Sequence, residues 1–560
     1  MKTITIKDTN FVIKIPYDIT LVNLIKISFS GRKWNPDFKT WQAPISEKNI
    51  SAALQLATYQ GFIISPATMI EIGIWKKKLN IQNEKANEMV EMSKAVDADI
   101  EIPIKSNDKL FPFQKAGVQF IEKTGGRVLI ADEPGCGKTL QAIAWCQLHF
   151  EKRPILVICP KTLMINWKIE FTKWVGIKSY IIISKDNEYQ LPTTTYEAYI
   201  INYDIVEKQK NLLKKIDPKI IILDESTAIK NPKAKRTKAI NEIVKDCPHI
   251  LALTGTPTLN SRPIEIYNTL KILSPQNFGN YWEFASRYCG LTRTRWGVNV
   301  SGATNIQELA EKLRSTVMIR RLKKDVLKEL PDKMRIIVPQ EINMKEYKRI
   351  EDDLINYLIE EKNKSKLQAE KINLVSQLSR IEYLKQETVK AKLPLFIEWV
   401  KTMDLSKLVI FCHHREFIDQ LMIELSEFNP VKLMGGMSSE EKQKSIESFQ
   451  NDKNYRLFIG SITSAGMGIT LTAASHLAFL ELMFVPALHD QAEDRILRIG
   501  QKNACSIYYF IGEGTIEQEI YDLLQSKRKI FRELMQDKNN VIENTDTNIL
   551  NDLVNKLVNR

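Results

Sequence analysis

Two long stretches of the chain alternate short apolar runs with helical patterns, and each stretch predicts a parallel α/β lobe. The first spans residues 106–270, and its apolar runs are 155–159, 198–202, 220–223 and 250–253. The second spans residues 396–535, with apolar runs at 408–411, 457–460 and 477–480. Continuous apolar runs between helices are typical of strands buried on both faces of a parallel sheet. We therefore expect an α/β fold with two doubly wound sheets.

The remaining segments show other patterns. Residues 271–395 contain few strand signals, and their Lys-, Glu-, Leu- and Ile-rich part has a helical period, which predicts a helical insertion between the lobes. Residues 1–66 show strand-like alternation around a turn-rich segment, as in a small β-rich module. Residues 67–105 have the pattern of a helical connector, and the Asn- and Asp-rich tail at 536–560 is expected to be loosely ordered in part.

Composition narrows the class of protein. The chain of 560 residues has 80 Lys and Arg against 67 Asp and Glu, and this excess favours polyanionic partners. Its N-terminus has no signal-peptide pattern and no apolar run reaches about 18 residues, so membrane insertion and secretion are not expected. The seven cysteines are scattered without a CxxC pair, which favours a reduced compartment over disulfides or structural zinc. We expect a cytoplasmic protein, associated with the nucleoid if the source is bacterial or viral.

The segment 132–139, Asp-Glu-Pro-Gly-Cys-Gly-Lys-Thr, has the pattern of a phosphate-binding loop. An apolar run precedes it and a helical pattern follows, which is the context that a P-loop requires. Gly135 and Gly137 would let backbone N–H groups approach phosphates, Lys138 would reach the β and γ oxygens, and Thr139 would ligate Mg²⁺. The strict pattern has Gly where Asp132 stands. A glycine turn without a ligand is the alternative for this loop taken alone.

Two further motifs suit phosphoryl transfer. Asp224 and Glu225 end an apolar run, so Asp224 is a candidate for Mg²⁺ binding and Glu225 for the general base that orients the attacking water. In the second lobe, Arg495 and Arg498 are three residues apart and would share one helix face, from which both could reach across a cleft as arginine fingers. An exposed amphipathic helix with surface arginines is the alternative.

Together the motifs resemble those of the helicase superfamily II motors of the SWI/SNF type, over about residues 106–535. Further segments carry the likeness: 111–114, 159–161 with 166–170, 253–257, 320–331, 464–472 and 491–501. The resemblance implies two RecA-like lobes that close on ATP and Mg²⁺ and track along DNA.

The resemblance also implies roles for single residues. Gln114 would contact the adenine base, and Lys161 and Trp167 would belong to the first DNA-tracking motif. Five residues would couple nucleotide state to lobe movement: Thr254, Gly255, Thr256, Gly466 and Gly468. The segment 320–326 resembles the stretch that links the lobes. The chain departs from the family at Thr227, where His is usual, and this bears on coupling rather than on metal binding.

A finer resemblance is to the annealing-helicase branch, which rewinds DNA and remodels forks. Residues 479–482 are similar to that branch, and residues 11–44 look like its HARP-type domain. Aromatic side chains beside basic ones suit stacking on bases and contact with phosphates at a junction. The candidates for such contacts are Arg32, Lys33, Trp34 and Trp41. The alternative is a small β core in which both tryptophans are packing residues.

The sequence thus predicts a DNA-stimulated ATPase that moves on double-stranded DNA and remodels or reanneals structures such as forks, with single-stranded DNA as a further candidate partner. Its contacts should go mostly to phosphates, which predicts little sequence preference and strong salt dependence. The alternatives are a strand-separating DNA or RNA helicase and a non-catalytic DNA-binding scaffold. The intact set of ATP-site residues argues against the scaffold.

Overall fold

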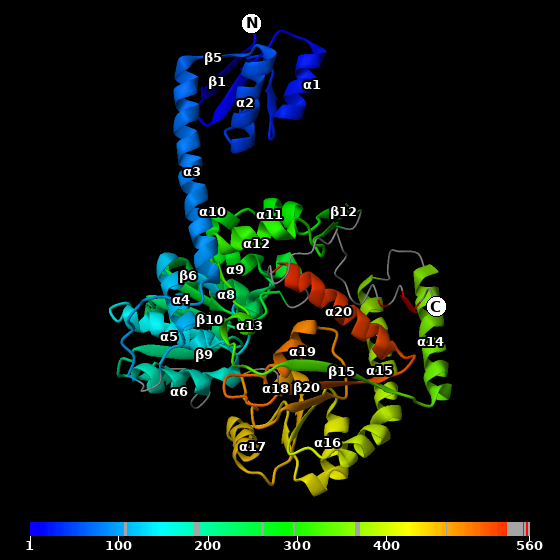
Figure 1. The fold of residues 1–560 in the computed structure, drawn as a ribbon. Helices are drawn as coiled ribbons and strands as arrows, with labels where there is room; N and C mark the ends of the chain where they lie inside the picture. Colours follow the sequence, from blue (N-terminus) through cyan, green and yellow to red (C-terminus); the bar gives the residue numbers. More distant parts are fainter. Residues whose placement is uncertain are drawn as a thin grey trace. The chain divides into compact units, whose positions relative to one another are not determined.

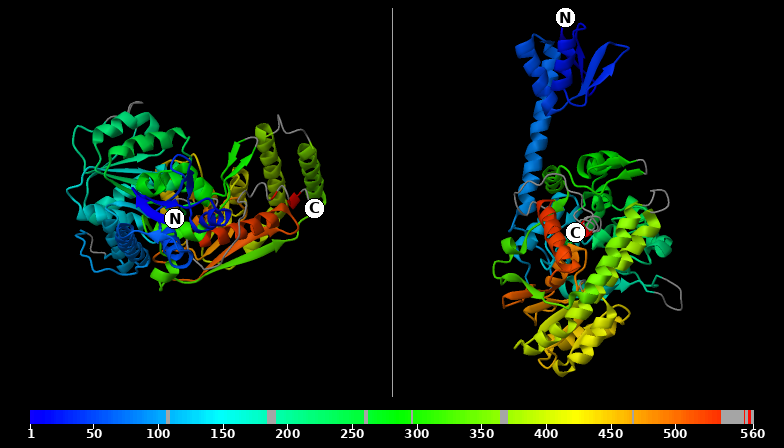
Figure 2. Two further views of the ribbon diagram at one scale, coloured as in Figure 1. Left: turned by 90° about the horizontal axis from the view of Figure 1, so that it is seen from above. Right: turned by 90° about the vertical axis from the view of Figure 1, so that its right-hand side faces the viewer.

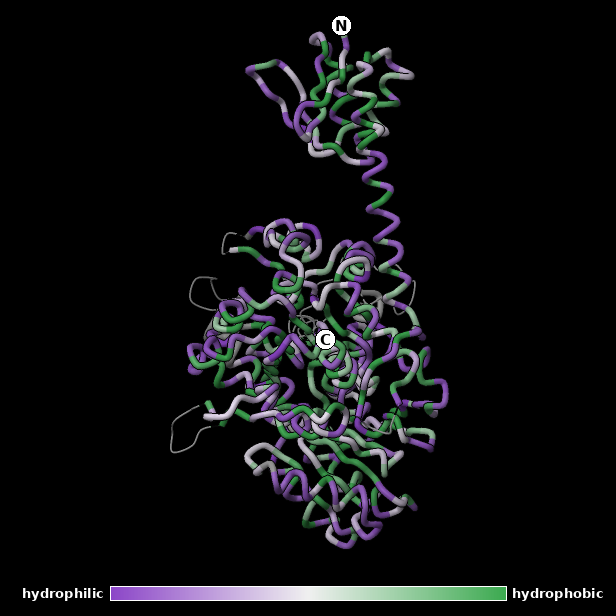
Figure 3. The backbone as a smooth tube through the Cα atoms, turned by 90° about the vertical axis from the view of Figure 1, so that its left-hand side faces the viewer, coloured by the Kyte–Doolittle hydropathy of each residue, from purple (hydrophilic) through white to green (hydrophobic). Residues whose placement is uncertain are grey.

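The chain folds into two compact units, Met1–Glu91 and Met92–Arg560 (Figure 1). The computed structural model describes residues 1–105, 109–183, 191–258, 262–294, 297–363, 370–465, 468–534, 553 and 556–557. Hydrophobic residues are concentrated in the interior of each unit (Figure 3). Nearly all of the predicted tail at 536–560 lies outside the described residues.

The N-terminal unit contains a mixed five-stranded sheet in the order β3-β4-β2-β1-β5. Its strands are β1 (Thr3–Lys7), β2 (Asn10–Lys14), β3 (Lys33–Asn35), β4 (Thr40–Pro44) and β5 (Ile63–Ile64). This sheet confirms the predicted β-rich module, and two helices that the alternating pattern does not indicate, α1 (Ile19–Ser28) and α2 (Glu47–Gln60), complete it. In α1, Asp18 caps the first turn and only Leu21 and Ile25 are buried, so the helical period is weak in the sequence.

The helix α3 (Pro66–Lys94) begins where the predicted connector begins. Ile72 is buried in the core of the N-terminal unit, and Trp75 and Leu79 pack against the same core. The N-terminal unit therefore includes the first turns of this helix and extends beyond the boundary predicted at residue 66.

The first lobe of the second unit is built on a seven-stranded parallel sheet in the order β14-β6-β11-β10-β7-β9-β8. The strands are β6 (Arg127–Ile130), β7 (Ile155–Cys159), β8 (Ser179–Ile181), β9 (Ala198–Asn202), β10 (Ile220–Asp224), β11 (His249–Leu253) and β14 (Met318–Ile319). The main helices are α4 (Pro112–Lys123), α5 (Lys138–Leu148), α6 (Met164–Val175), α7 (Val206–Ile216), α8 (Lys235–Ile243), α9 (Tyr267–Leu273), α10 (Pro275–Phe278), α11 (Tyr281–Tyr288) and α12 (Ile306–Arg314). Because β6, β11 and β10 are neighbours, the loops after them meet at one edge of the sheet.

The second lobe has a six-stranded parallel sheet in the order β15-β20-β19-β16-β18-β17. The strands are β15 (Lys333–Gln340), β16 (Leu408–Cys412), β17 (Val431–Leu433), β18 (Leu457–Ser461), β19 (His476–Phe479) and β20 (Cys505–Gly512). The helices are α16 (Arg415–Glu424), α17 (Ser439–Asn451), α18 (Ile462–Ala465), α19 (Pro486–Glu493) and α20 (Ile516–Leu534). The two sheets confirm the predicted fold of two α/β lobes.

The predicted helical insertion at 271–395 needs correction, because it contains strands of both lobes. The short β14 completes the first sheet, and β15 is an edge strand of the second. The sequence of β15 lacks a continuous apolar run: Met334 and Ile337 are exposed, and Pro339 is tolerated because an edge strand has a free side. The same segment contains a hairpin of β12 (Thr292–Thr294) and β13 (Gly297–Asn299), which precedes β14, and the short helix α13 (Lys323–Val326), which lies between β14 and β15 in the chain.

Two long helices follow β15, as the helical pattern predicts: α14 (Met344–Asn363) and α15 (Glu370–Thr402). They pack against each other, as the left view of Figure 2 shows. Leu354 and Leu358 of α14 and Leu384 of α15 are buried in the core of the second lobe. The pair is therefore anchored along one face rather than solvated all round.

A buried ion pair ties the P-loop to the segment that links the lobes. The Nε of Arg321 donates to Asp132 Oδ1 at 3.0 Å, and the Nε2 of Gln141 donates to Asp132 Oδ2 at 2.9 Å. Both charged side chains are almost completely buried. Burial opposes ionisation of Asp132, but the guanidinium of Arg321 outweighs it and holds the pKa of this carboxyl below its ordinary value. The Asp at the first P-loop position is thus a structural requirement of this chain.

The ion pair predicts that restoring the strict P-loop pattern will destabilise the protein. Asp132→Gly leaves the Arg321 guanidinium buried without its carboxylate, which should lower the free energy of unfolding by about 3–5 kcal/mol. Urea unfolding measures the change, and Asp97→Gly, at an exposed position, controls for the added backbone freedom. Equal stability of the two variants would contradict a supporting role for the pair.

Candidate functional site

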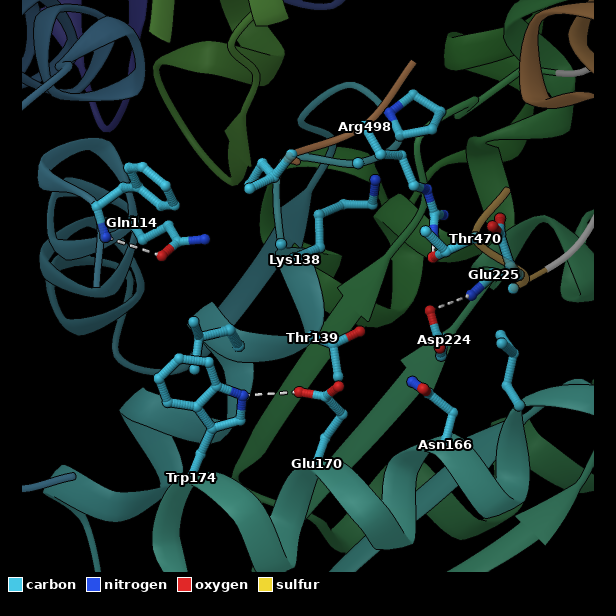
Figure 4. Close-up of a pocket in the computed structure, with 18 of the residues that line it drawn as sticks. Gln114, Lys138, Thr139, Asn166, Glu170, Trp174, Asp224, Glu225, Thr470 and Arg498 are labelled. Carbon is cyan, nitrogen blue, oxygen red and sulfur yellow. Dashed lines mark hydrogen bonds between the residues drawn. The ribbon is translucent and has the colours of Figure 1, made fainter. Parts of the chain in front are cut away.

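A cavity of about 590 Å³ lies between the two lobes (Figure 4). Its first wall carries Gln114, the P-loop, and residues of α6 and of the end of β10. Its second wall carries five residues of the other lobe: Gly468, Thr470, Arg495, Arg498 and Ile499. The motifs that the sequence separates by more than 350 residues therefore share one cavity.

The P-loop has the conformation that its glycines permit. Gly135 has φ +92° and Gly137 has φ +74°, both in the left-handed region. A Cβ on Gly137 would lie 2.4 Å from the Nε2 of Gln114. Gly137 precedes α5, so the free N–H groups of this helix begin at the cavity. This backbone forms the concave donor surface that an anion requires.

Lys138 extends along the loop toward the centre of the cavity. Its Nζ donates to the backbone oxygens of Asp132 at 2.9 Å and Glu133 at 3.3 Å. Burial lowers the pKa of Lys138, and the charge of Glu225 opposes this shift. Thr139 follows on the same wall (Figure 4). A cation and a hydroxyl thus stand beside the donor surface of the loop.

The acidic pair lies at the carboxyl end of β10. Asp224 accepts hydrogen bonds from the Nε1 of Trp167 at 2.8 Å and from the backbone N of Glu225 at 3.0 Å. Burial and the neighbouring Glu225 raise the pKa of Asp224 to about 6. Glu225 has φ +51° and accepts a hydrogen bond from the Oγ1 of Thr254 at 3.2 Å. A second carboxylate so close to Asp224 favours a cation at this site.

The structure corrects the DNA-contact prediction for Trp167. Its side chain is 1% exposed, and its indole N–H is directed to Asp224. A residue buried behind the acidic pair cannot touch DNA, so its place is in support of that pair. Lys161, in the same predicted motif, is exposed in the turn after β7 and remains available for a phosphate contact.

The helix α6 also supplies cavity residues that the motif analysis assigns elsewhere or omits. Asn166, Glu170 and Trp174 line the cavity, and the Nε1 of Trp174 donates to Glu170 Oε2 at 2.7 Å. Figure 4 shows them on the side of the cavity away from Arg498. Their spacing of four residues places them on one helix face. This periodicity is the feature of the sequence from which their shared position could be predicted.

At the other end of the same wall, Gln114 is buried near the P-loop. Its Oε1 accepts from the backbone N of Phe111 at 3.0 Å, and its Nε2 donates to the backbone oxygen of Cys136 at 3.2 Å. The amide is therefore fixed by contacts on both sides and borders the cavity. This position stays compatible with the predicted contact to a base.

The two arginines reach the cavity from turns rather than from a helix face. The helix α19 ends at Glu493, and the backbone oxygen of Arg495 accepts from the N of Leu471 at 2.8 Å instead of continuing the helix. The Nη1 of Arg498 donates to Thr470 Oγ1 at 3.0 Å. Burial lowers the pKa of Arg495 to about 9. The shared helix face is thus wrong, but the shared cavity is observed.

The Nε of Arg498 is buried and has no hydrogen-bond partner among the described residues. A buried donor without a partner costs free energy. An oxygen atom of a ligand that enters the cavity could accept a hydrogen bond from this donor.

Two of the predicted coupling residues, Thr256 and Gly468, lie where the lobes meet. The Oγ1 of Thr256 accepts from the Nε2 of Gln491 in the second lobe at 3.0 Å. A Cβ on Gly255 would lie 2.5 Å from Pro134 of the P-loop, and one on Gly468 would lie 2.1 Å from Leu163. These glycines allow close approach between segments. Gly466 lies outside the described residues.

In the N-terminal unit, the two predicted tryptophans differ. Trp34 and Trp41 are paired across β3 and β4 with ring centroids 5.3 Å apart. Trp34 is 47% exposed, whereas Trp41 packs against the core. Arg32 and Lys33 are exposed beside Trp34. The hairpin therefore exposes one aromatic ring, directly preceded in the chain by two exposed cations, while the second tryptophan packs beneath the sheet against the core.

Comparison with protein families finds two matches. Residues 113–391 match the SNF2-related domain, and residues 390–500 match the helicase conserved C-terminal domain. Both matches fall in the second unit, and together they contain all of the cavity-lining residues except Lys109 and Phe111. The described helices include none that is long and apolar enough to cross a membrane.

Individual relatives extend the comparison. A Caenorhabditis elegans protein, the homolog of SWI/SNF-related matrix-associated actin-dependent regulator of chromatin subfamily A-like protein 1, is 31% identical over 525 residues, covering 91% of this chain and 72% of the relative. The human DNA annealing helicase and endonuclease ZRANB3 is 32% identical over 449 residues, covering 77% of this chain and 40% of the relative. The chain thus spans less than half of the human protein.

Among solved structures, the Sulfolobus solfataricus SWI2/SNF2 ATPase core in complex with dsDNA is 26% identical, with a TM-score of 0.38, covering 78% of this chain and 96% of that one. The family matches and the long alignment with the nematode relative agree with the motifs in the cavity. The chain belongs to the SNF2-related family and is a DNA-dependent ATPase of helicase superfamily II.

Proposed function

We propose that this ATPase moves on double-stranded DNA and remodels or reanneals DNA structures such as forks. The observation that carries the proposal is the single cavity in which Lys138, the acidic pair and the arginines of the other lobe meet. A site completed by two lobes links hydrolysis to their relative movement, and such a link is what a translocase requires. The similarity to a protein named a DNA annealing helicase supports the second part.

The donor set fits ATP with Mg²⁺. The positive-φ glycines leave room for phosphate oxygens beside the backbone N–H groups, and Lys138 supplies charge to the β and γ positions. Thr139 and Asp224 would hold Mg²⁺, and Gln114 would contact the base. When bound, Mg²⁺ would neutralise charge on the phosphate oxygens. Arg498 lines the same cavity, and its positive charge fits an anionic ligand.

Glu225 is placed to act on the attacking water. The hydrogen bond from Thr254 orients its carboxylate, and Glu225 borders the cavity beside Asp224. As general base it would orient the water and take up its proton. Arg495 and Arg498 would stabilise the negative charge that develops on the transferred phosphoryl group. The proposed chemistry thus combines the phosphate-binding, metal-binding and base residues of the first lobe with two arginines of the second.

DNA contact is proposed for two surfaces, one in each unit. Lys161 is exposed in the turn after β7, where it would contact the phosphate backbone of a duplex. In the N-terminal unit, the exposed ring of Trp34 would stack on an unpaired base, while Arg32 and Lys33 would contact phosphates. Stacking requires an accessible base, so this unit would favour junctions over intact duplex.

The first prediction concerns the general base. Glu225→Gln should keep nucleotide and DNA binding but lower steady-state ATP turnover by about 10²-fold or more, because general-base catalysis typically contributes 10²–10⁴-fold. Glu207→Gln, on the exposed side of α7, is the matched control and should retain the parent rate. Near-parental turnover of Glu225→Gln would remove this residue from the role of base.

A second prediction separates binding from chemistry. Arg498→Ala should bind ATP with near-parental affinity yet lose about 10³-fold or more of its DNA-stimulated turnover, because an arginine finger acts on the transition state. Lys502→Ala, four residues further and exposed, should behave like the parent. Parallel losses of affinity and turnover in Arg498→Ala would indicate a ground-state role instead.

The third prediction tests the N-terminal unit. Trp34→Ala should weaken binding to forked DNA by about tenfold, since stacking contributes about 1–3 kcal/mol per base, and should leave duplex-stimulated ATPase activity unchanged. Tyr59→Ala, also exposed in this unit, is the control, and circular dichroism checks the fold. If the fork preference survives in the folded Trp34→Ala protein, fork recognition by this surface is excluded.

Stimulation of the parent ATPase by RNA or by single-stranded DNA alone would favour the alternative function of a strand-separating helicase.

A further inference from the structure

The segment 320–323 contacts three parts of the ATP site in succession. Arg320 donates to the backbone oxygen of Ala131 at 2.7 Å, and Arg321 forms the buried pair with Asp132. Two residues later, Lys323 turns to the other lobe. Its Nζ is 2.7 Å from Asp494 Oδ1 and 2.8 Å from the backbone oxygen of Leu497. One short segment therefore holds both the P-loop and the arginine-bearing turns.

Lys323 is fixed at both of its ends. Its backbone N donates to Glu133 Oε2 of the P-loop at 2.6 Å, while its side chain bonds to the second lobe. The side chains of Lys323 and Asp494 are 7% and 9% exposed. This ion pair therefore bridges the lobes out of reach of bulk water.

The partners of Lys323 stand directly before the two arginines. Asp494 precedes Arg495 in the chain, and Leu497 precedes Arg498. A Cβ on Gly135 would lie 3.2 Å from the Cε of Lys323 and 3.3 Å from the Cγ of Arg498, so these two side chains pack side by side on the P-loop. Lys323 is not among the described residues that line the cavity. Its side-chain bonds thus lead to the arginine-bearing turns rather than into the cavity.

We propose that Lys323 is a positioning residue: its bond to Asp494 and Leu497 holds Arg495 and Arg498 against the P-loop when the lobes are closed. This rests on the proposed role of these arginines in hydrolysis. Charges that leave water on closing regain hydration on opening, so such a pair adds little net stability and can form and break in each cycle. The pair orients the arginine-bearing turns rather than adding stability. Such a contact suits a motor whose lobes must also open.

The test is Lys323→Met, which keeps the length of the side chain and removes its charge. DNA-stimulated kcat should fall about tenfold, equivalent to about 1.4 kcal/mol of lost transition-state stabilisation, while the affinity for a fluorescent ADP analogue stays at the parent value. Asp494 retains Lys333 at 3.7 Å in this variant, so its charge is not stranded. Lys324→Met, at the exposed neighbouring position, should match the parent in both measurements.

A double-mutant cycle identifies the pair as the cause. Asp494→Asn should also lower kcat, and the double variant should be no slower than Lys323→Met alone, because both changes remove one interaction. Additive losses in kcat would overturn the proposal. So would a fall in ADP-analogue affinity and thermal midpoint that parallels the loss in kcat, since a merely structural residue gives that result.

Arg498→Ala, measured beside these variants, separates this inference from the proposed function. If Arg498→Ala is inactive while Lys323→Met hydrolyses ATP at the parent rate, the positioning role fails and the arginine mechanism stands. If Arg498→Ala keeps the parent rate, the arginine mechanism itself fails, and the positioning role fails with it.

Discussion

The arrangement of the ATP site depends on the buried ion pair between Asp132 and Arg321. This pair fixes the start of the P-loop to the segment that leads toward the second lobe. From that anchor, Arg320 holds the backbone at Ala131, and Lys323 reaches the turns that carry the arginines. A charge pair without access to water has few alternative geometries, and so the path of the linking segment is set by electrostatics as much as by packing.

The parallel sheet of the first lobe supplies the other constraint. Because β6, β11 and β10 are adjacent, their carboxyl ends bring the P-loop, Thr254 and the acidic pair to one edge. The hydrogen bond from Thr254 to Glu225 is a direct result of this strand order. The second lobe then contributes the two arginines, for which we propose a role late in the reaction. Division of the site between two lobes thus follows from the topology of one of them.

Much of this could be predicted from the sequence, where local patterns are strong. Continuous apolar runs identified the buried strands, and the residues of the phosphate loop and acidic pair meet in one cavity as their motifs indicate. The edge strand β15 escaped prediction because it is half exposed and contains Pro339. The sequence motif predicts a DNA contact for Trp167. Its burial behind Asp224 results from the tertiary fold, which the local pattern does not reveal. The turn at Arg495 likewise depends on a residue distant in the sequence. The backbone N of Leu471 donates to the carbonyl oxygen of Arg495, which therefore does not continue the helix.

The helix α6 has different functions on its different faces. One face, with Trp167 and Phe171, is buried; a second, with Asn166 and Glu170, borders the nucleotide cavity; a third exposes apolar side chains such as Ile165. Asn166, Glu170 and Trp174 thus line the cavity, and Trp167 supports the acidic pair. A genetic screen that scored mutations of these four residues as defects in nucleic-acid binding would therefore misread them, since each altered residue borders the cavity or lies behind Asp224.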